Sequence, residues 1–257
     1  MQAGETLTYY IGLADAMNAA NALGSGKYTV TVLRDTGVTG VDAAGSMTDK
    51  DVILDKLHSS GSVKLDLNGH TIDGGGAIYA GYQGSEGLLY VTGGGKILHV
   101  TIDVMGAIEL QGFTGTIEAV RAVNADGVKS DNETSGIIGT LTLGSRPTTY
   151  LAGGTIGKVI AADTLTAGQL LLPGYAFQTQ DGSPVRYDAK ANGLENVTVA
   201  NCTHTELGTD FAGTNCPYCD ADLVALVTKE LSVLGKKQTV TIGFADLRGA
   251  LKLAGGG

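Results

Sequence analysis

The sequence predicts an all-β protein whose strands wind into a parallel β-solenoid. Glycine is unusually frequent, at 40 of 257 residues, whereas aromatic residues make up only 5% and tryptophan is absent. Short runs of alternating or β-branched residues lie between the glycines, and four of these runs recur about every 20 residues. A coil of that length cannot bury its apolar face alone and therefore stacks on its neighbour.

The composition also limits the partners of the chain. Its hydrophobic content of 43% is sufficient for a packed core and too high for a disordered chain. The 26 acidic and 17 basic side chains give a net charge of −9, which disfavours binding to nucleic acid. No segment approaches the ~18 uninterrupted apolar residues of a membrane span, so no membrane insertion is expected.

The first expected element is a helix over residues 13–23. Its apolar side chains form one stripe, and Gly24 follows as a stop signal. The stripe consists of Leu13, Met17, Ala20 and Leu23. Because the first coil of a solenoid has an open apolar end and an unpaired sheet edge, we expect the helix to cap it. The alternative is that the helix packs on the face of a sheet.

Alternating strands with one buried face are expected at residues 28–33, 62–67 and 140–143. The approximate 20-residue period is carried by four positions within β-branched runs. These are Leu98, Ile117, Ile138 and Ile156, at successive intervals of 19, 21 and 18 residues. The spacing favours a solenoid over a β-sandwich, whose strands form antiparallel hairpins and usually carry more aromatic core residues. Glycines are then expected at the corners.

A tight corner is expected within the phrase DLNGHTI (66–72). Asn68 and Gly69 suit the positive φ angles of such a corner. The residues expected to face inward are Leu65, Leu67 and Ile72. We expect His70 to be a stacking or hydrogen-bonding partner within the coil, in preference to a catalytic group. His58 and His99 are expected to be surface or coil-stacking residues.

Three phrases of the sequence point to a known kind of module: TVTVLRD (29–35), VKLDLNGHTIDGGG (63–76) and LLLPGYAFQTQDGSPV (170–185). They resemble the right-handed β-helix modules, similar in architecture to pectate lyases, of large surface proteins in Gram-positive bacteria. In those modules a helix akin to IGLADAMNAANA (11–22) precedes the first strand. The resemblance implies a right-handed parallel β-helix and an extracellular, cell-wall or cell-surface location.

The two ends of the chain are similar to each other. Residues 11–26 and 242–257 share seven identities in sixteen positions, at a constant offset of 231. We therefore expect a tandem array within a longer polypeptide, in which adjacent modules are partners. The expected organisation is a β-helix module with its capping helix (1–195), a Cys/His metal-binding loop (196–222), and a linker strand with the start of the next module (223–257).

All three cysteines and one histidine lie close together near the end of the chain. Cys202-Thr203-His204 is followed, after eleven residues, by Cys216-Pro217-Tyr218-Cys219. On an extended segment, side chains at i and i+2 point the same way, and Cys-x-x-Cys can form a tight turn. Three Cys and one His make a closed tetrahedral set for structural zinc. The sequence thus predicts a zinc-knuckle-like segment with the ligands Cys202, His204, Cys216 and Cys219.

A disulfide is the competing interpretation of the cysteines. It suits the extracellular compartment that the resemblance implies. Three cysteines, however, leave one odd thiol, which exported chains usually avoid unless a metal or partner holds it. A redox-active Cys-x-x-Cys would ordinarily open a helix, whereas residues 220–227 are more typical of a strand.

Two functional classes remain open from the sequence. The first is a non-catalytic extracellular module that acts as a stalk or adhesin, with a glycan or host protein as the candidate ligand. The alternative is a carbohydrate-active β-helix enzyme, a polysaccharide lyase or hydrolase, which needs clustered carboxylates. The candidate groups are Asp66, Asp73, Asp103 and Arg121. Scarce aromatic residues favour the module, although four tyrosines are available for sugar stacking: Tyr79, Tyr82, Tyr90 and Tyr150.

Overall fold

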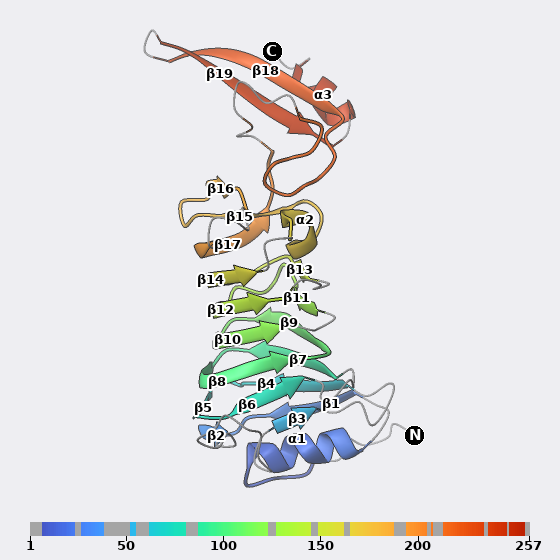
Figure 1. The fold of residues 1–257 in the computed structure, drawn as a ribbon, viewed down its shortest axis with the longest axis vertical. Coiled ribbons are helices and arrows are strands. Elements are labelled where there is room, and N and C mark those ends of the chain that lie inside the picture. The colour runs from blue at the N-terminus through green and yellow to red at the C-terminus, as the bar shows by residue number, and fades with distance from the viewer. Residues whose placement is uncertain are drawn as a thin grey trace.

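The predicted solenoid is confirmed by the computed structural model. It describes residues 7–23, 27–38, 52–54, 62–80, 87–122, 127–144, 149–161, 165–187, 194–204, 207, 213–233, 236–245 and 247–254. Within these ranges the chain is mostly strand and forms a β-solenoid of about four turns. Figure 1 shows the strands stacked along the long axis, with the N-terminus and the C-terminus at opposite ends.

The first sheet of the solenoid contains one strand from each coil. Its order is β1 (Lys27–Thr31), β4 (Ser62–Asp66), β7 (Leu88–Gly93), β9 (Ala107–Phe113), β11 (Gly127–Ser130) and β13 (Tyr150–Leu151). All neighbouring strands in this sheet are parallel. Parallel pairing requires the chain to cross over between successive strands, and the second sheet provides this crossover.

The second sheet lies along the other side of the same coils. Its parallel part runs β2 (Thr36–Val38), β5 (Thr71–Gly74), β8 (Lys96–Val104), β10 (Thr116–Ala122), β12 (Ile137–Leu143) and β14 (Thr155–Ala161). Two further strands, β3 (Val52–Leu54) and β6 (Ala77–Ala80), extend it, because β6 pairs with both β3 and the second half of β8. Each coil therefore contributes to both sheets.

The core between the sheets consists of aliphatic side chains stacked from coil to coil. In the second sheet the register aligns Ile72, Ile97, Ile117, Ile138 and Ile156, and none of them is more than 3% exposed. In the first sheet it aligns Val30, Leu65, Val91 and Leu110. Adjacent strands lie about 4.8 Å apart, so each side chain contacts the one above and below. Burying one such side chain contributes about 1.5–3 kcal/mol.

The period predicted from Ile117, Ile138 and Ile156 is confirmed, but the prediction for Leu98 is wrong. Ile97 occupies the aligned core position, and the register shifts between Ile117 and Ala119 so that β8 carries extra residues. Such a bulge changes the spacing locally while the coils on either side stay aligned. Residue spacing in the sequence alone cannot predict the position of this bulge.

His99 lies in this bulge and links three coils on the outside of the solenoid. Its backbone has a φ of 54°, and its N–H donates to Glu118 Oε2 at 2.7 Å. Its Nδ1 is 2.8 Å from Asp73 Oδ1, and this contact raises the pKa of His99 above its ordinary value. The side chain is well exposed. The prediction of a surface or coil-stacking residue is therefore confirmed.

The predicted corner at Asn68-Gly69 is present. Asn68 has a φ of 48° and Gly69 a φ of 81°, both in the left-handed region. The three residues predicted to face inward have no exposed surface: Leu65, Leu67 and Ile72. Asn68 Nδ2 also donates to the carbonyl of Val32 at 3.1 Å, which ties this corner to the preceding coil.

His70 acts as a hydrogen-bonding partner within the solenoid, as predicted. Its backbone N–H donates to the carbonyl of Leu67 at 2.8 Å, which closes the corner. Its Nδ1 lies 3.4 Å from Asp35 Oδ1. The predictions for His58 and Tyr82 fall outside the described residues.

The N-terminal helix α1 (Leu13–Ala22) caps the start of the solenoid. It packs against β1, β2, β3 and β4, and Figure 1 shows it across the end of the stack. Three of the four predicted stripe residues are buried: Leu13, Met17 and Ala20. The prediction for Leu23 is wrong, because the helix ends at Ala22 and the Leu23 side chain is 64% exposed.

The parallel stacking ends beyond β14. The short helix α2 (Ala167–Leu170) is followed by β15 (Tyr175–Gln178), β16 (Pro184–Val185) and β17 (Glu195–Asn201). These three strands continue the second sheet in antiparallel pairing, β17 with both β14 and β15. The boundary expected at residue 195 therefore lies at the start of β17, and the sheet continues to Asn201.

The remaining chain forms a hairpin with a helix. The strands β18 (Ala225–Val233) and β19 (Lys236–Phe244) pair antiparallel over nine positions. Helix α3 (Leu247–Ala254) follows and packs against both of them. In the part of the chain that the structure describes, neither this helix nor any other is long and apolar enough to cross a membrane.

A column of glycines permits close stacking at the corner that precedes the second sheet. The N–H of Thr116 donates to the carbonyl of Gly95, and the N–H of Ile137 to the carbonyl of Gly115, both at 2.8 Å. A Cβ on Gly115 would lie well inside van der Waals contact with the Gly95 oxygen. A Cβ on Gly136 would clash in the same way with the Gly115 oxygen. Any side chain there would push the coils apart.

We expect Gly115→Ala to lower the free energy of unfolding by about 1–3 kcal/mol, because the new Cβ displaces a stacked backbone. Urea unfolding followed by circular dichroism measures this change. Gly75→Ala is the matched control, since no atom lies within 4 Å of its added Cβ. Equal stability of the two variants would contradict the proposed role of the glycine column.

Candidate metal centre

The first half of the Cys/His cluster follows directly from strand β17. Cys202 and His204 stand two residues apart, just after Asn201, where the chain leaves the second sheet. The N–H of Cys202 donates to the carbonyl of Gly174 at 2.7 Å, which fixes this segment to the end of the solenoid. Both side chains enter the same cluster, as predicted, although His204 has a φ of 54° and is therefore not in the extended conformation on which the prediction rests.

The second half is a tight turn built by Cys216-Pro217-Tyr218-Cys219. The N–H of Asp220 donates to the carbonyl of Cys216 at 2.9 Å, and Asp220 has a φ of 62°. Asn215 braces the turn, since its Nδ2 donates to Asp222 Oδ1 at 2.7 Å. This turn brings the two cysteines to one side, as the Cys-x-x-Cys spacing predicts.

The four side chains have the dimensions of a tetrahedral site. The sulfurs of Cys202 and Cys216 are 3.7 Å apart, and Nε2 of His204 is 3.3 Å from the sulfur of Cys219. All four ligand atoms lie within 4.8 Å of one another. A tetrahedral ion with metal–sulfur bonds of about 2.3 Å separates two sulfurs by about 3.8 Å. The predicted residues can therefore hold one metal ion.

The thiols of the cluster influence one another's ionisation. Hydrogen bonds from Cys202 and Cys219 hold the pKa of Cys216 far below its ordinary value. The pKa of Cys202 is raised, chiefly by its contact with Cys216. Three thiolates in this volume would repel each other unless a cation neutralised them.

The structure does not join the cysteines by a disulfide. All three are free thiols, and Cys216 and Cys219 are buried. The separation of 3.7 Å between the sulfurs of Cys202 and Cys216 is far longer than the disulfide bond of about 2.05 Å. The chain after Cys219 continues into strand β18 with no intervening helix, unlike a redox-active Cys-x-x-Cys.

The cluster lies between the end of the solenoid and the terminal hairpin. The carbonyl of His204 accepts a hydrogen bond from the N–H of Gly243 in β19, at 3.0 Å. The buried residues around the site are Ala176 of β15, Leu207, Cys216 and Cys219. Leu223 packs against them and comes within contact distance of a Cβ placed on Gly243. The site therefore connects two parts of the fold.

The acidic residues considered for an enzyme do not converge on one site. The guanidinium of Arg121 donates to the carboxylate of Asp103, whose side chain is almost fully buried. Asp73 pairs with His99, as described above. Asp66 lies in the first sheet and accepts the backbone N–H of Asn68 at 3.0 Å. Over the described ranges, no second group of three or more His, Cys, Asp or Glu ligand atoms gathers as the Cys/His cluster does.

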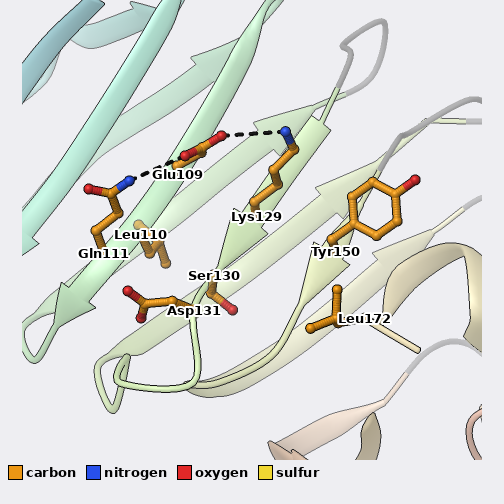
Figure 2. Close-up of a pocket in the computed structure, with 8 residues that line it drawn as sticks. All are labelled: Glu109, Leu110, Gln111, Lys129, Ser130, Asp131, Tyr150 and Leu172. Carbon is orange, nitrogen blue, oxygen red and sulfur yellow. Dashed lines mark hydrogen bonds and ion pairs between the residues drawn. The ribbon is translucent and has the colours of Figure 1, made fainter. Parts of the chain in front are cut away.

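A shallow groove of about 250 Å³ on the first sheet was not foreseen from the sequence. Figure 2 shows Lys129 between Glu109 and Tyr150 along it. The register aligns four outward side chains on successive coils: Tyr90, Glu109, Lys129 and Tyr150. Their sequence intervals repeat the coil length, so the period that locates the core could also have located this column.

The carboxylates of the groove are already engaged. Glu109 receives hydrogen bonds from Lys129 at 3.4 Å and Gln111 at 3.3 Å. Asp131 accepts the N–H of Gly112 at 3.0 Å and the hydroxyl of Thr134 at 2.8 Å. A carboxylate fixed in this way is poorly placed to exchange protons with a substrate.

Comparisons with known proteins give no relative for the chain. A scan against protein families found no match, and neither did searches of curated proteins and of solved structures. Its function is therefore inferred from its own residues and their geometry.

We expect Cys216→Ser to weaken metal binding by at least ~100-fold, since even residues behind the ligands contribute 10–100-fold. Elemental analysis should find one metal ion per wild-type chain. In the Cys216→Ser variant, hydrogen exchange should be faster than in the wild type over residues 202–225. It should stay unchanged in the upstream coils, because each coil contacts mainly its neighbours. Pro217→Ala is the control, because it alters the same turn and keeps all four ligands. A single cooperative melting of the whole chain on chelation would contradict this separation.

Proposed function

We propose that this chain is a non-catalytic module of an extracellular tandem-repeat protein of the bacterial cell surface. Its stacked coils form a stalk or adhesin, and a structural zinc ion holds the joint to the next module. The position of the Cys/His cluster carries the proposal. The N–H of Cys202 donates to the carbonyl of Gly174 at the solenoid end, and the carbonyl of His204 accepts the N–H of Gly243 in β19.

The arrangement of the chain supports an array. The termini lie at opposite ends of the long axis, so consecutive modules would extend the structure and would not close a ring (Figure 1). The hairpin and helix that follow the metal cluster contain the segment similar to residues 11–26. The joint between two modules would thus include the metal cluster.

Zinc is the proposed ion because of the donor set. Thiolate and imidazole ligands in a tetrahedral arrangement suit zinc, and the cluster has no carboxylate or carbonyl ligand of the kind that calcium and magnesium prefer. Three cysteines and one histidine fill all four positions. The ion would therefore stabilise structure and would leave no site for a reactive water.

The extracellular, wall-associated location is supported by the resemblance of residues 29–35, 63–76 and 170–185 to surface modules of Gram-positive bacteria. The alternative of a polysaccharide lyase or hydrolase has less support. Its candidate acids lie in separate ion pairs or turns, whereas a glycosidase needs two free carboxylates about 5–9 Å apart on either side of the substrate.

The first sheet favours a second activity, glycan binding. Tyr90 and Tyr150 lie three coils apart in one outward column, about 14 Å by strand spacing. Between them, Glu109 and Lys129 offer an acceptor and a donor to sugar hydroxyls. Tyr150 is 40% exposed, so a sugar ring can stack on its face. A glycan chain lying along the solenoid axis is the proposed ligand.

A two-module polypeptide, in which residues 1–231 are followed directly by residues 1–257, tests whether consecutive modules form an extended stalk. With zinc bound, its maximum dimension in small-angle X-ray scattering should be about twice that of one copy, because heterologous joints extend the array. Chelation should leave each module folded and broaden the distribution of dimensions. A compact particle, or scattering that does not change on chelation, would argue against a zinc-stabilised stalk.

We expect Tyr150→Ala to reduce glycan binding by about 2- to 13-fold, since one stacking contact contributes roughly 0.5–1.5 kcal/mol. A glycan array identifies the ligand, and titration calorimetry measures the loss. Lys158→Ala is the control, because Lys158 is an exposed ion-pairing residue on the second sheet. Equal loss in both variants, or no ligand on the array, would rule out this binding site.

A further inference from the structure

The N-terminal segment before helix α1 is apolar and exposed. Its large side chains are mostly in solvent, with exposed fractions of 77% for Leu7, 76% for Tyr9 and 90% for Ile11. The residues from Leu7 to Tyr10 form no strand, although their composition is typical of one. The carbonyl of Ile11 is contacted by Arg34 at 3.5 Å, which holds the segment beside the first coil.

The C-terminal hairpin contains the counterpart of this segment. At the offset of 231, Thr8–Leu13 corresponds to Thr239–Phe244, and Thr8, Ile11 and Gly12 are identical to their counterparts. Gly4 and Gly235 also match at this offset. The counterpart residues form the second half of β19, where they pair with β18. The same sequence pattern is thus paired at one end of the chain and unpaired at the other.

The paired segment in β19 is also more buried than its counterpart at the N-terminal end. Thr241 in β19 is buried and its hydroxyl lies 3.3 Å from that of Thr228 in β18, whereas its counterpart Tyr10 is 46% exposed. The N-terminal segment therefore lacks the strand that β18 provides at the other end.

The two terminal helices show the complementary difference. Leu247 and Leu251 of α3 are 60% and 63% exposed, and their counterparts in α1 are Ala16 and Ala20. Both alanines pack against the core of the first coils. Helix α3 therefore lacks the solenoid coil that α1 covers. The C-terminal end thus contains β18, a strand that could pair with the N-terminal segment, and the N-terminal end contains the kind of coil that a helix such as α3 could cover.

We propose that residues 227–230 of a preceding copy pair antiparallel with residues 8–11, which lie before helix α1 and take the place that residues 239–242 of β19 have in the structure. This inference rests on the proposed tandem array. Glu230 of the preceding copy then lies opposite Thr8, Thr228 opposite Tyr10, and Val227 opposite Ile11. The joint between two modules is thus a pair of strands, one from each copy. This pair lies beside the metal cluster of the preceding copy.

Supplying the strand within one chain tests this pairing. Residues 223–231 are placed directly before Met1, which reproduces the offset of 231 between the paired segments. Hydrogen exchange of the amides from Thr8 to Ile11 is compared in the extended and unextended full chains. We expect exchange to slow at least tenfold, because these N–H groups gain partners in a strand. A nine-residue Gly/Ser extension is the matched control.

A second variant separates strand pairing from any other effect of the added segment on hydrogen exchange. Prolines at both Val227 and Thr228 of the added strand remove two successive donors, and they leave the chain's own hairpin intact. This variant should exchange as fast as the Gly/Ser control, and the solenoid should keep its circular dichroism spectrum. Equal exchange with the native and the Gly/Ser extension would overturn the proposed pairing. An extended two-copy particle in scattering with unprotected Thr8–Ile11 amides would refute this inference alone and leave the stalk standing.

Discussion

In-register stacking of the coils is the constraint on which the rest of this structure depends. A parallel ladder of hydrogen bonds places the same position of each coil above the last, so one aliphatic side chain in each coil must fall on the next. A slip of one residue would turn that side chain outward. The chain therefore accommodates an irregular coil length with the bulge at His99 and keeps Ile97 over Ile117.

The ends of the stack require separate solutions, because stacking leaves an apolar face and a free sheet edge at each end. Helix α1 covers the first coil. At the other end the strands turn antiparallel through β17 and β15, and the Cys/His cluster follows at once. A bound ion would replace hydrophobic contacts where few are available, since among the described residues this buried group adds only Ala176 and Leu207 to the ligands Cys216 and Cys219.

The outer surface follows the same register as the core. Side chains one coil apart lie opposite each other, which creates the pairs Asp103–Arg121 and Glu109–Lys129. The Asp103 carboxylate is nearly buried, but the Glu109–Lys129 pair lies partly in solvent, where an ion pair contributes little stability, so such outward positions are free to be used for binding. The column from Tyr90 to Tyr150 is an example, because the spacing of the coils sets the spacing of its side chains.

The sequence by itself determined the solenoid, the capping helix and the four members of the metal cluster. Each of these depends on local spacing: the coil length, the stripe of α1, and the Cys-x-His and Cys-x-x-Cys intervals. Only the tertiary structure decided that Ile97 replaces Leu98, that Leu23 is exposed, and that β17 belongs to the sheet. It also placed the metal cluster beside β19. These features depend on contacts between residues far apart in the chain, which a periodic pattern does not specify.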